Sequence, residues 1–68
     1  MSAIKYWEEI DTRKLENGMF KWVITFNSTK GGETTSIDVI GVDTYTTDKA
    51  AYDAAEKKVE EKRRLRGE

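Results

Sequence analysis

The fold is decided by Met19-Phe20-Lys21-Trp22-Val23-Ile24-Thr25-Phe26, the most apolar stretch of this 68-residue chain. Bulky apolar side chains occupy every second position of the stretch, and the positions between them are mixed. This period of two, together with the β-branched and aromatic content, predicts a strand with one buried face. Turn-forming residues lie on both sides, at Asn17-Gly18 and within residues 27–32. We therefore expect a central strand with a hairpin at each end.

The preceding segment, Ile4–Leu15, is predicted as the first strand, and its register depends on the turn at residues 16–18. A two-residue Asn-Gly loop would place charged side chains on the face of the bulky apolar residues. A three-residue loop, with Gly18 in the left-handed conformation, instead places Ile10 opposite Ile24. Because a slip of one residue exchanges the two faces of a strand, the hydrophobic pattern favours the three-residue loop.

A third strand is expected over Thr34–Val42, which is rich in β-branched residues. The connection that leads to it, residues 27–33, contains Gly31-Gly32, and adjacent glycines are typical of positive φ angles. Gly41 lies near the end of this strand and predicts a bulge there. Each strand is expected to pair with the next along the chain, which gives an antiparallel sheet.

The segment Lys49–Leu65 predicts a helix, because it is rich in alanine, lysine and glutamate, which are good helix formers. Either Thr46 or Thr47 can cap its N-terminus with a side-chain hydroxyl. Gly67 follows the helix and is typical of a helix end. The side predicted to face the sheet consists of Ala51, Tyr52, Ala55 and Val59, with Ala54 beside them.

These segments predict an α+β fold: a three-stranded antiparallel sheet in the order 1-2-3, with one C-terminal helix packed on one face. The fold forms a single small domain of residues 1–68, and we expect Trp22, Ile24 and Phe20 to be its most buried side chains. A domain of this size buries only about 60% of the surface of its unfolded chain. Because the sequence contains no cysteine, disulfide bonds cannot stabilise it, and its stability must come from this core.

The composition excludes most catalytic chemistry. With neither histidine nor cysteine, the chain cannot form a Ser-His-Asp or Cys-His arrangement or a histidine-containing metal site. The carboxylates of Glu8, Glu9 and Asp11 lie on a strand, where adjacent side chains point to opposite faces, and they are typical of solvated charges. We therefore expect a non-catalytic protein with no cofactor, no metal ion and no small-molecule substrate.

Nothing in the sequence predicts contact with a membrane. No apolar run approaches the ~18 residues of a membrane-spanning helix, and no signal-peptide core is present. The absence of cysteine fits a reducing compartment. We expect a soluble, cytoplasmic protein.

The sheet face that the helix leaves open carries candidate partner-binding residues. In the favoured register Trp7 points to this face, and an exposed tryptophan requires an explanation. One interpretation is that Trp7 packs against Met19 or the N-terminal arm, or that a bulge turns it inward. The other is that it anchors a partner protein, as aromatic and basic residues often do. On the second interpretation the candidate residues are Trp7, Arg13, Lys21 and Val23.

Positive charge is concentrated at the C-terminal end. Residues 1–56 contain six basic and ten acidic side chains, whereas residues 57–68 contain six basic and three acidic ones. One interpretation is a solvated helix end with salt bridges. The other is a patch that binds phosphates or an acidic protein. On the second interpretation the candidate residues are Lys58, Lys62, Arg63, Arg64 and Arg66.

Several segments occur in a familiar order: Lys21–Phe26, Gly31-Gly32, the third strand, and Tyr45-Thr46-Thr47-Asp48-Lys49-Ala50-Ala51. In this order the chain resembles the arm-type DNA-binding domain at the N-terminus of phage-type tyrosine integrases. Tyr45, Thr47 and Ala51 occupy the places of that family's aromatic residue, threonine and early helical alanine. The resemblance implies a three-stranded sheet that lies in the major groove of DNA. Since the recombinase domain is absent, it also implies a free-standing accessory protein of a phage or mobile element.

Two functions are expected from these features. The first is a small accessory or regulatory module of phage type that binds another protein, or a second copy of itself, through the open sheet face or a strand edge. The alternative is a DNA-binding accessory protein that uses the three-stranded sheet and the basic end of the helix. A steep fall of duplex affinity with salt concentration would indicate the alternative.

Overall fold

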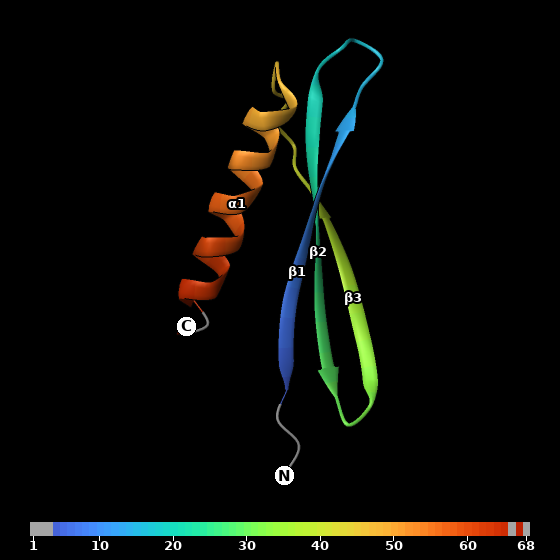
Figure 1. Cartoon of the computed structure of the whole chain (residues 1–68), viewed down its shortest axis with the longest axis vertical. Helices are drawn as coiled ribbons and strands as arrows, with labels where there is room; N and C mark the ends of the chain where they lie inside the picture. Colours follow the sequence, from blue (N-terminus) through green and yellow to red (C-terminus); the bar gives the residue numbers. More distant parts are fainter. Residues whose placement is uncertain (1–3, 66, 68) are drawn as a thin grey trace.

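The computed structural model describes residues 4–65 and residue 67. In this part of the chain, three strands form one antiparallel sheet in the order β1-β2-β3, and one helix follows them (Figure 1). The predicted α+β fold is confirmed. Within the same residues, no helix combines the length and the apolar character needed to cross a membrane. The elements are β1 (Lys5–Lys14), β2 (Phe20–Lys30), β3 (Glu33–Ile40) and α1 (Asp48–Leu65).

The first hairpin has the predicted three-residue loop. Leu15 N donates to Met19 O over 2.7 Å, and Gly18 N donates to Leu15 O over 3.0 Å. Gly18 has a φ angle of 84°, which is the left-handed conformation that the loop requires. Ile10 therefore lies opposite Ile24, and the apolar face of β1 joins that of β2.

The second hairpin is tighter than predicted. β2 continues to Lys30, which pairs with Glu33 across a two-residue turn at Gly31-Gly32. Both glycines have positive φ angles, 58° and 86°, as such a turn requires. Residues 27–30 therefore belong to β2 and not to a loop, because their serine and threonine side chains suit an exposed strand as well as a turn.

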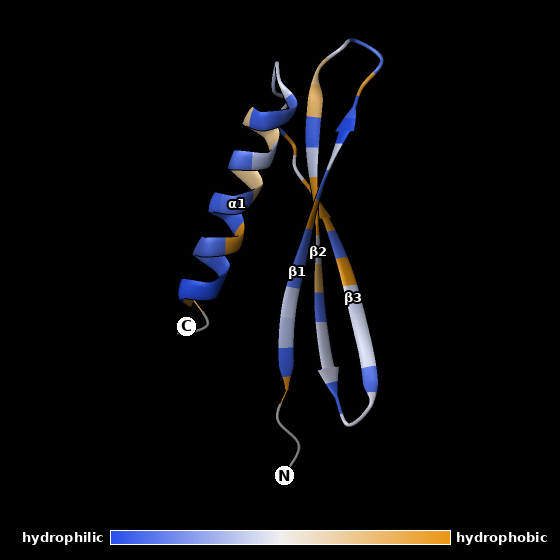
Figure 2. Cartoon of the chain, in the orientation of Figure 1, coloured by the Kyte–Doolittle hydropathy of each residue, from blue (hydrophilic) through white to orange (hydrophobic). Residues whose placement is uncertain are grey.

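The core lies between β2 and α1, where large strand side chains meet small helix side chains. Figure 2 shows the hydrophobic segments of α1 on the side that faces the sheet. Ile24 is completely buried and Trp22 nearly so, and both pack in one cluster with Ala55 and Val59. Because alanine extends little beyond the backbone, α1 can lie close to the indole of Trp22. Ile10, Phe26, Tyr45 and Ala54 pack around this cluster.

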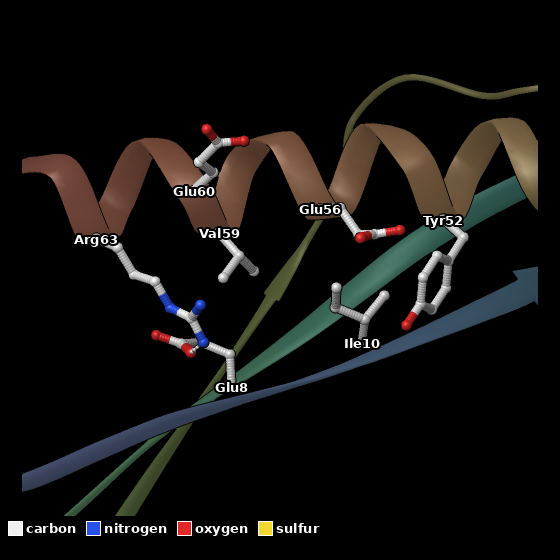
Figure 3. A pocket seen from close by; sticks show the side chains of 7 residues that line it. All are labelled: Glu8, Ile10, Tyr52, Glu56, Val59, Glu60 and Arg63. Carbon is white, nitrogen blue, oxygen red and sulfur yellow. Dashed lines mark hydrogen bonds and ion pairs between the residues drawn. The ribbon is translucent and has the colours of Figure 1, made fainter. Parts of the chain in front are cut away.

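Two predictions about burial are wrong. Phe20 is only half-buried, because it lies at the first position of β2, where an isolated bridge to Tyr45 takes the place of pairing with β3. Tyr52, expected on the inward side of α1, is exposed and lies beside Ile10 where α1 faces β1 (Figure 3). The buried side of α1 is thus narrower than predicted, and consists of Ala51, Ala55 and Val59.

The start of α1 is fixed by Thr47, which decides between the two predicted caps. Thr47 Oγ1 accepts a hydrogen bond of 3.1 Å from Ala50 N, and Thr47 O accepts one of 3.2 Å from Ala51 N. Asp48 in the first turn accepts a hydrogen bond from Thr12 Oγ1 of β1. This contact ties the N-terminus of the helix to the sheet.

Gly41 has a different role from the predicted one. The register of β2 and β3 continues through Gly41 without a bulge, and Gly41 N donates to Trp22 O over 3.0 Å. A Cβ atom added at Gly41 would lie 2.5 Å from Cε2 of Trp22. The indole therefore occupies the space that a side chain would need. The predicted end of the strand at Val42 is also wrong, because β3 ends at Ile40.

Candidate interaction surface

β3 is an edge strand that pairs with β2 on one side only, and all eight of its residues are exposed. The hydrogen bond from Gly41 N to Trp22 O shows which backbone groups near this end of β3 point toward β2. Since hydrogen-bonding direction alternates along an antiparallel strand, the even-numbered residues of β3 direct their N–H and C=O groups outward. These residues are Thr34, Ser36, Asp38 and Ile40.

The two edges of the sheet differ in their protection against another strand. β1 carries six charged residues among ten, and α1 contacts it. β3 carries only Glu33 at its start and Asp38, with no lysine and no proline. Charged residues, lysine above all, and prolines are what natural proteins use to block an edge strand. β3 is therefore the edge that is open to pairing.

An apolar groove runs along the helix side of β3, because α1 lies over β1 and β2 rather than over β3 (Figure 1). Ile37, on this side, is 60% exposed. Lys62 Nζ lies 5.7 Å from the centroid of the Phe26 ring, which is within the range of a cation–π contact. We call this surface the β3 groove. Its lining consists of Tyr6, Phe26, Asn27, Ser28, Thr35, Ile37, Val39, Lys58, Glu61, Lys62 and Leu65.

The open sheet face contains the predicted partner-binding residues but does not bring them together. Trp7 is 38% exposed and lies opposite Asn27. Arg13 pairs with Lys21 close to the first hairpin. Arg13 lies six positions along the strand from Trp7, which is about 20 Å at the usual rise of a strand. Trp7 and the Arg13–Lys21 pair are therefore two separate surface features.

Two side chains on this open face are buried, which sequence reasoning missed. Val23 is 5% exposed, with Asp11 and Ile40 beside it on the neighbouring strands, so its predicted exposure is wrong. Asn27, predicted in the second turn, is also buried, and its Oδ1 accepts a hydrogen bond of 2.6 Å from Ser36 Oγ. No local signal marks these positions, because their burial comes from residues on adjacent strands.

The basic residues at the end of α1 point in different directions and do not form one patch. Lys58 and Lys62 line the β3 groove. Arg64 pairs along the helix with Glu60 over 3.5 Å, and both side chains are exposed. Arg66 lies outside the described residues. Two of the predicted basic residues therefore contribute to the same surface as β3.

Arg63 contacts β1 instead. Its Nη2 lies 2.9 Å from Oε2 of Glu8, whose side chain is only 3% exposed (Figure 3). The two residues are far apart in sequence, so no helical spacing reveals the pair. Arg63 thus links the last turns of α1 to β1, and part of the basic helix end has a structural role.

We expect Arg63→Gln to lower the free energy of unfolding by about 1–2 kcal/mol, because it removes a cationic partner from a carboxylate that is almost fully buried. The loss is smaller than for a fully buried pair, since the Arg63 side chain is itself 56% exposed. Arg64→Gln is the matched control, because exposed pairs contribute less than about 1 kcal/mol. Urea denaturation of both variants measures the difference, and equal losses would contradict the role of Arg63.

No protein family, curated protein or solved structure matches this chain. The features that point to a function are therefore those of the chain itself. They are the open edge of β3, the apolar β3 groove beside it, and the charged residues Lys58, Glu61 and Lys62 on the α1 side of that groove.

Proposed function

We propose that this protein is a small non-catalytic module that binds an extended segment of a protein chain along β3. The observation that carries the proposal is the combination of an unprotected strand edge with an apolar groove directly beside it. Strand addition draws its affinity from main-chain hydrogen bonds and its specificity from pockets for alternate side chains. The outer edge of β3 offers main-chain hydrogen-bonding groups, and the β3 groove offers space for alternate side chains.

The bound segment would pair with the outward backbone groups of β3 and direct every second side chain toward the helix side. There, apolar side chains would cover Ile37 and Val39, which are exposed in the chain alone. Lys58, Glu61 and Lys62 stand at the α1 side of the groove, so charges of both signs border its apolar residues. The partner segment we propose is therefore extended, with apolar residues on the face that it turns toward α1.

Binding of DNA is the second candidate, and the resemblance to the arm-type domain of integrases favours it. The open sheet face offers Lys5, Arg13 and Lys21, but acidic side chains lie among them. These are Glu9, Asp11 and Asp38. An accessory or regulatory role of phage type is compatible with either function, but the charge of this face supports protein binding more strongly than phosphate binding.

The test is titration with a synthetic peptide that has the length of β3 and carries apolar residues at every second position, followed by amide hydrogen exchange. We expect the outward amides of β3 to be protected from exchange whenever β3 is paired, whether with this peptide or with another extended strand. Ile37→Lys, which places a charge at the groove, should weaken binding at least about tenfold. Val42→Lys is the matched control, because Val42 is 89% exposed and lies outside β3.

Equal affinity of the two variants, or protection at β1 instead of β3, would contradict the proposal. A parallel titration with duplex DNA at two salt concentrations examines the second candidate. Tight binding to the duplex would favour DNA if its association constant depends steeply on salt. The logarithm of that constant should then fall linearly with the logarithm of salt concentration, with a slope of about 0.9 for each neutralised phosphate.

A further inference from the structure

We infer that the extended segment that binds β3 is β3 of a second copy of this chain, so that two copies form a symmetric dimer with one continuous six-stranded sheet. This inference rests on the proposed function, since it names the partner for the same strand edge. β3 is itself an extended segment, and it carries Ile37 and Val39 at alternate positions on its helix side. It therefore offers the apolar side chains that the β3 groove requires.

Symmetry restricts how two such strands can pair. Antiparallel pairing of identical edge strands requires a two-fold axis perpendicular to the sheet, because the same patch is used by both copies. Opposed residues of an antiparallel pair point to the same face. The two copies of α1 then lie on one face, and an odd-numbered residue of β3 must oppose an odd-numbered one. Registers that mix the two faces are excluded.

Among the remaining registers, hydrogen bonding and charge favour the one centred on Ile37. It places Ile37 opposite its own copy, Val39 opposite Thr35 and Asp38 opposite Ser36. The residues whose backbone groups point outward then form four pairs, and each pair exchanges two hydrogen bonds, about eight in all. A register centred on Ser36 gives about six hydrogen bonds. A register centred on Asp38 would set two carboxylates directly opposite each other, which is unfavourable.

The same register suits the exposed surfaces that it covers. Ile37, 60% exposed in the single chain, would meet its own copy in a pair without hydrogen bonds, where side chains approach most closely. Glu33, the other charged residue of β3, lies beyond the paired residues. No two like charges lie directly opposite each other, and the most exposed apolar side chain of the strand becomes covered.

The position of α1 leaves room for this dimer. α1 lies over β1 and β2, so four strand spacings separate it from the α1 of the second copy. At about 4.8 Å per spacing this is about 19 Å, whereas a helix with its side chains is about 10–12 Å wide. The two helices therefore do not collide, and the two β3 strands lie between them in the sheet.

A single introduced cysteine reports the register, since the chain has no cysteine of its own. We expect Ile37→Cys to form a covalent dimer on mild oxidation, because opposed Cα atoms in such a pair lie about 4.5 Å apart, within the range of a disulfide. Thr35→Cys is the matched control. It lies on the same strand and face, but about 13 Å from its own copy, and should stay uncrosslinked. Efficient crosslinking of Ser36→Cys in place of Ile37→Cys would overturn the register.

Sedimentation equilibrium of the unmodified chain should show a dimer, and Ile37→Lys should yield a folded monomer with an unchanged circular dichroism spectrum. Val42→Lys should remain dimeric. A dimer that survives Ile37→Lys would show that another surface holds it, and would overturn the inference. A monomeric chain whose β3 amides are still protected by the peptide would overturn the inference but support the proposed function. A chain that shows neither dimer nor protection would contradict both.

Discussion

Trp22→Ala is expected to lower the free energy of unfolding by about 3–5 kcal/mol, which is the usual loss for a large aromatic side chain removed from a core. Trp22 packs with Ile24, Ala55 and Val59 in the buried cluster that joins α1 to the sheet. The free energy of unfolding of a folded domain is about 5–15 kcal/mol in total, and for a chain this small it lies toward the lower end of that range. The variant should therefore populate unfolded chains in dilute buffer. Urea denaturation followed by circular dichroism measures the loss.

Trp7→Ala is the matched control for this change. Trp7 is a second tryptophan on the neighbouring strand, but it is 38% exposed and lies opposite Asn27 on the face away from α1. Its removal should cost about 1 kcal/mol, as is usual for a partly exposed side chain. If the two variants lost the same stability, the core would not be centred on Trp22.

Gly41→Ala is expected to have the second largest effect, a loss of up to about 3 kcal/mol, because small-to-large changes in a packed site force displacement of the surroundings. The added Cβ would lie 2.5 Å from Cε2 of Trp22 and 2.8 Å from two further indole atoms. The indole cannot withdraw without losing its contacts with α1. Thermal or urea denaturation should show the loss.

A double-mutant cycle separates this clash from a general effect of alanine in place of glycine. In a Trp22→Leu background the indole is absent, so Gly41→Ala should cost much less than it does in the unmodified chain. Residues in contact typically show interaction energies of about 0.5–3 kcal/mol in such a cycle. Strict additivity of the two changes would mean that Gly41 is needed for a reason other than space for the indole.

The sequence was informative wherever one residue of displacement changes which side chains are buried. The first hairpin is such a case, because a slip would have exchanged Ile10 for charged neighbours opposite Ile24, and the observed register is the predicted one. Helix propensity and a threonine cap likewise place α1, with Thr47 chosen by the structure from two candidates. Local patterns of this kind depend on near neighbours in the chain.

What the sequence could not provide is how the elements lie relative to one another. The alternation of β3 does not reveal that α1 leaves Ile37 uncovered, because the lateral position of a helix on a sheet depends on every contact between them. The pairing of Arg63 with Glu8 joins the two ends of the chain and has no local signature. The burial of Val23 similarly results from both adjacent strands, and its own strand pattern predicted exposure.

The off-centre position of α1 also makes the local stability of the fold uneven. β1 and β2 are held by each other and by the helix, whereas β3 is held by its hydrogen bonds to β2 and by the turn at Gly31-Gly32. Segments with few buried apolar contacts open at a lower free energy than the whole domain unfolds. β3 should therefore detach transiently while the rest stays folded. A strand that binds only the attached form of β3 shifts this opening equilibrium toward that form by mass action. The fraction of chains in which β3 stays paired with β2 therefore rises with the concentration of the binding strand.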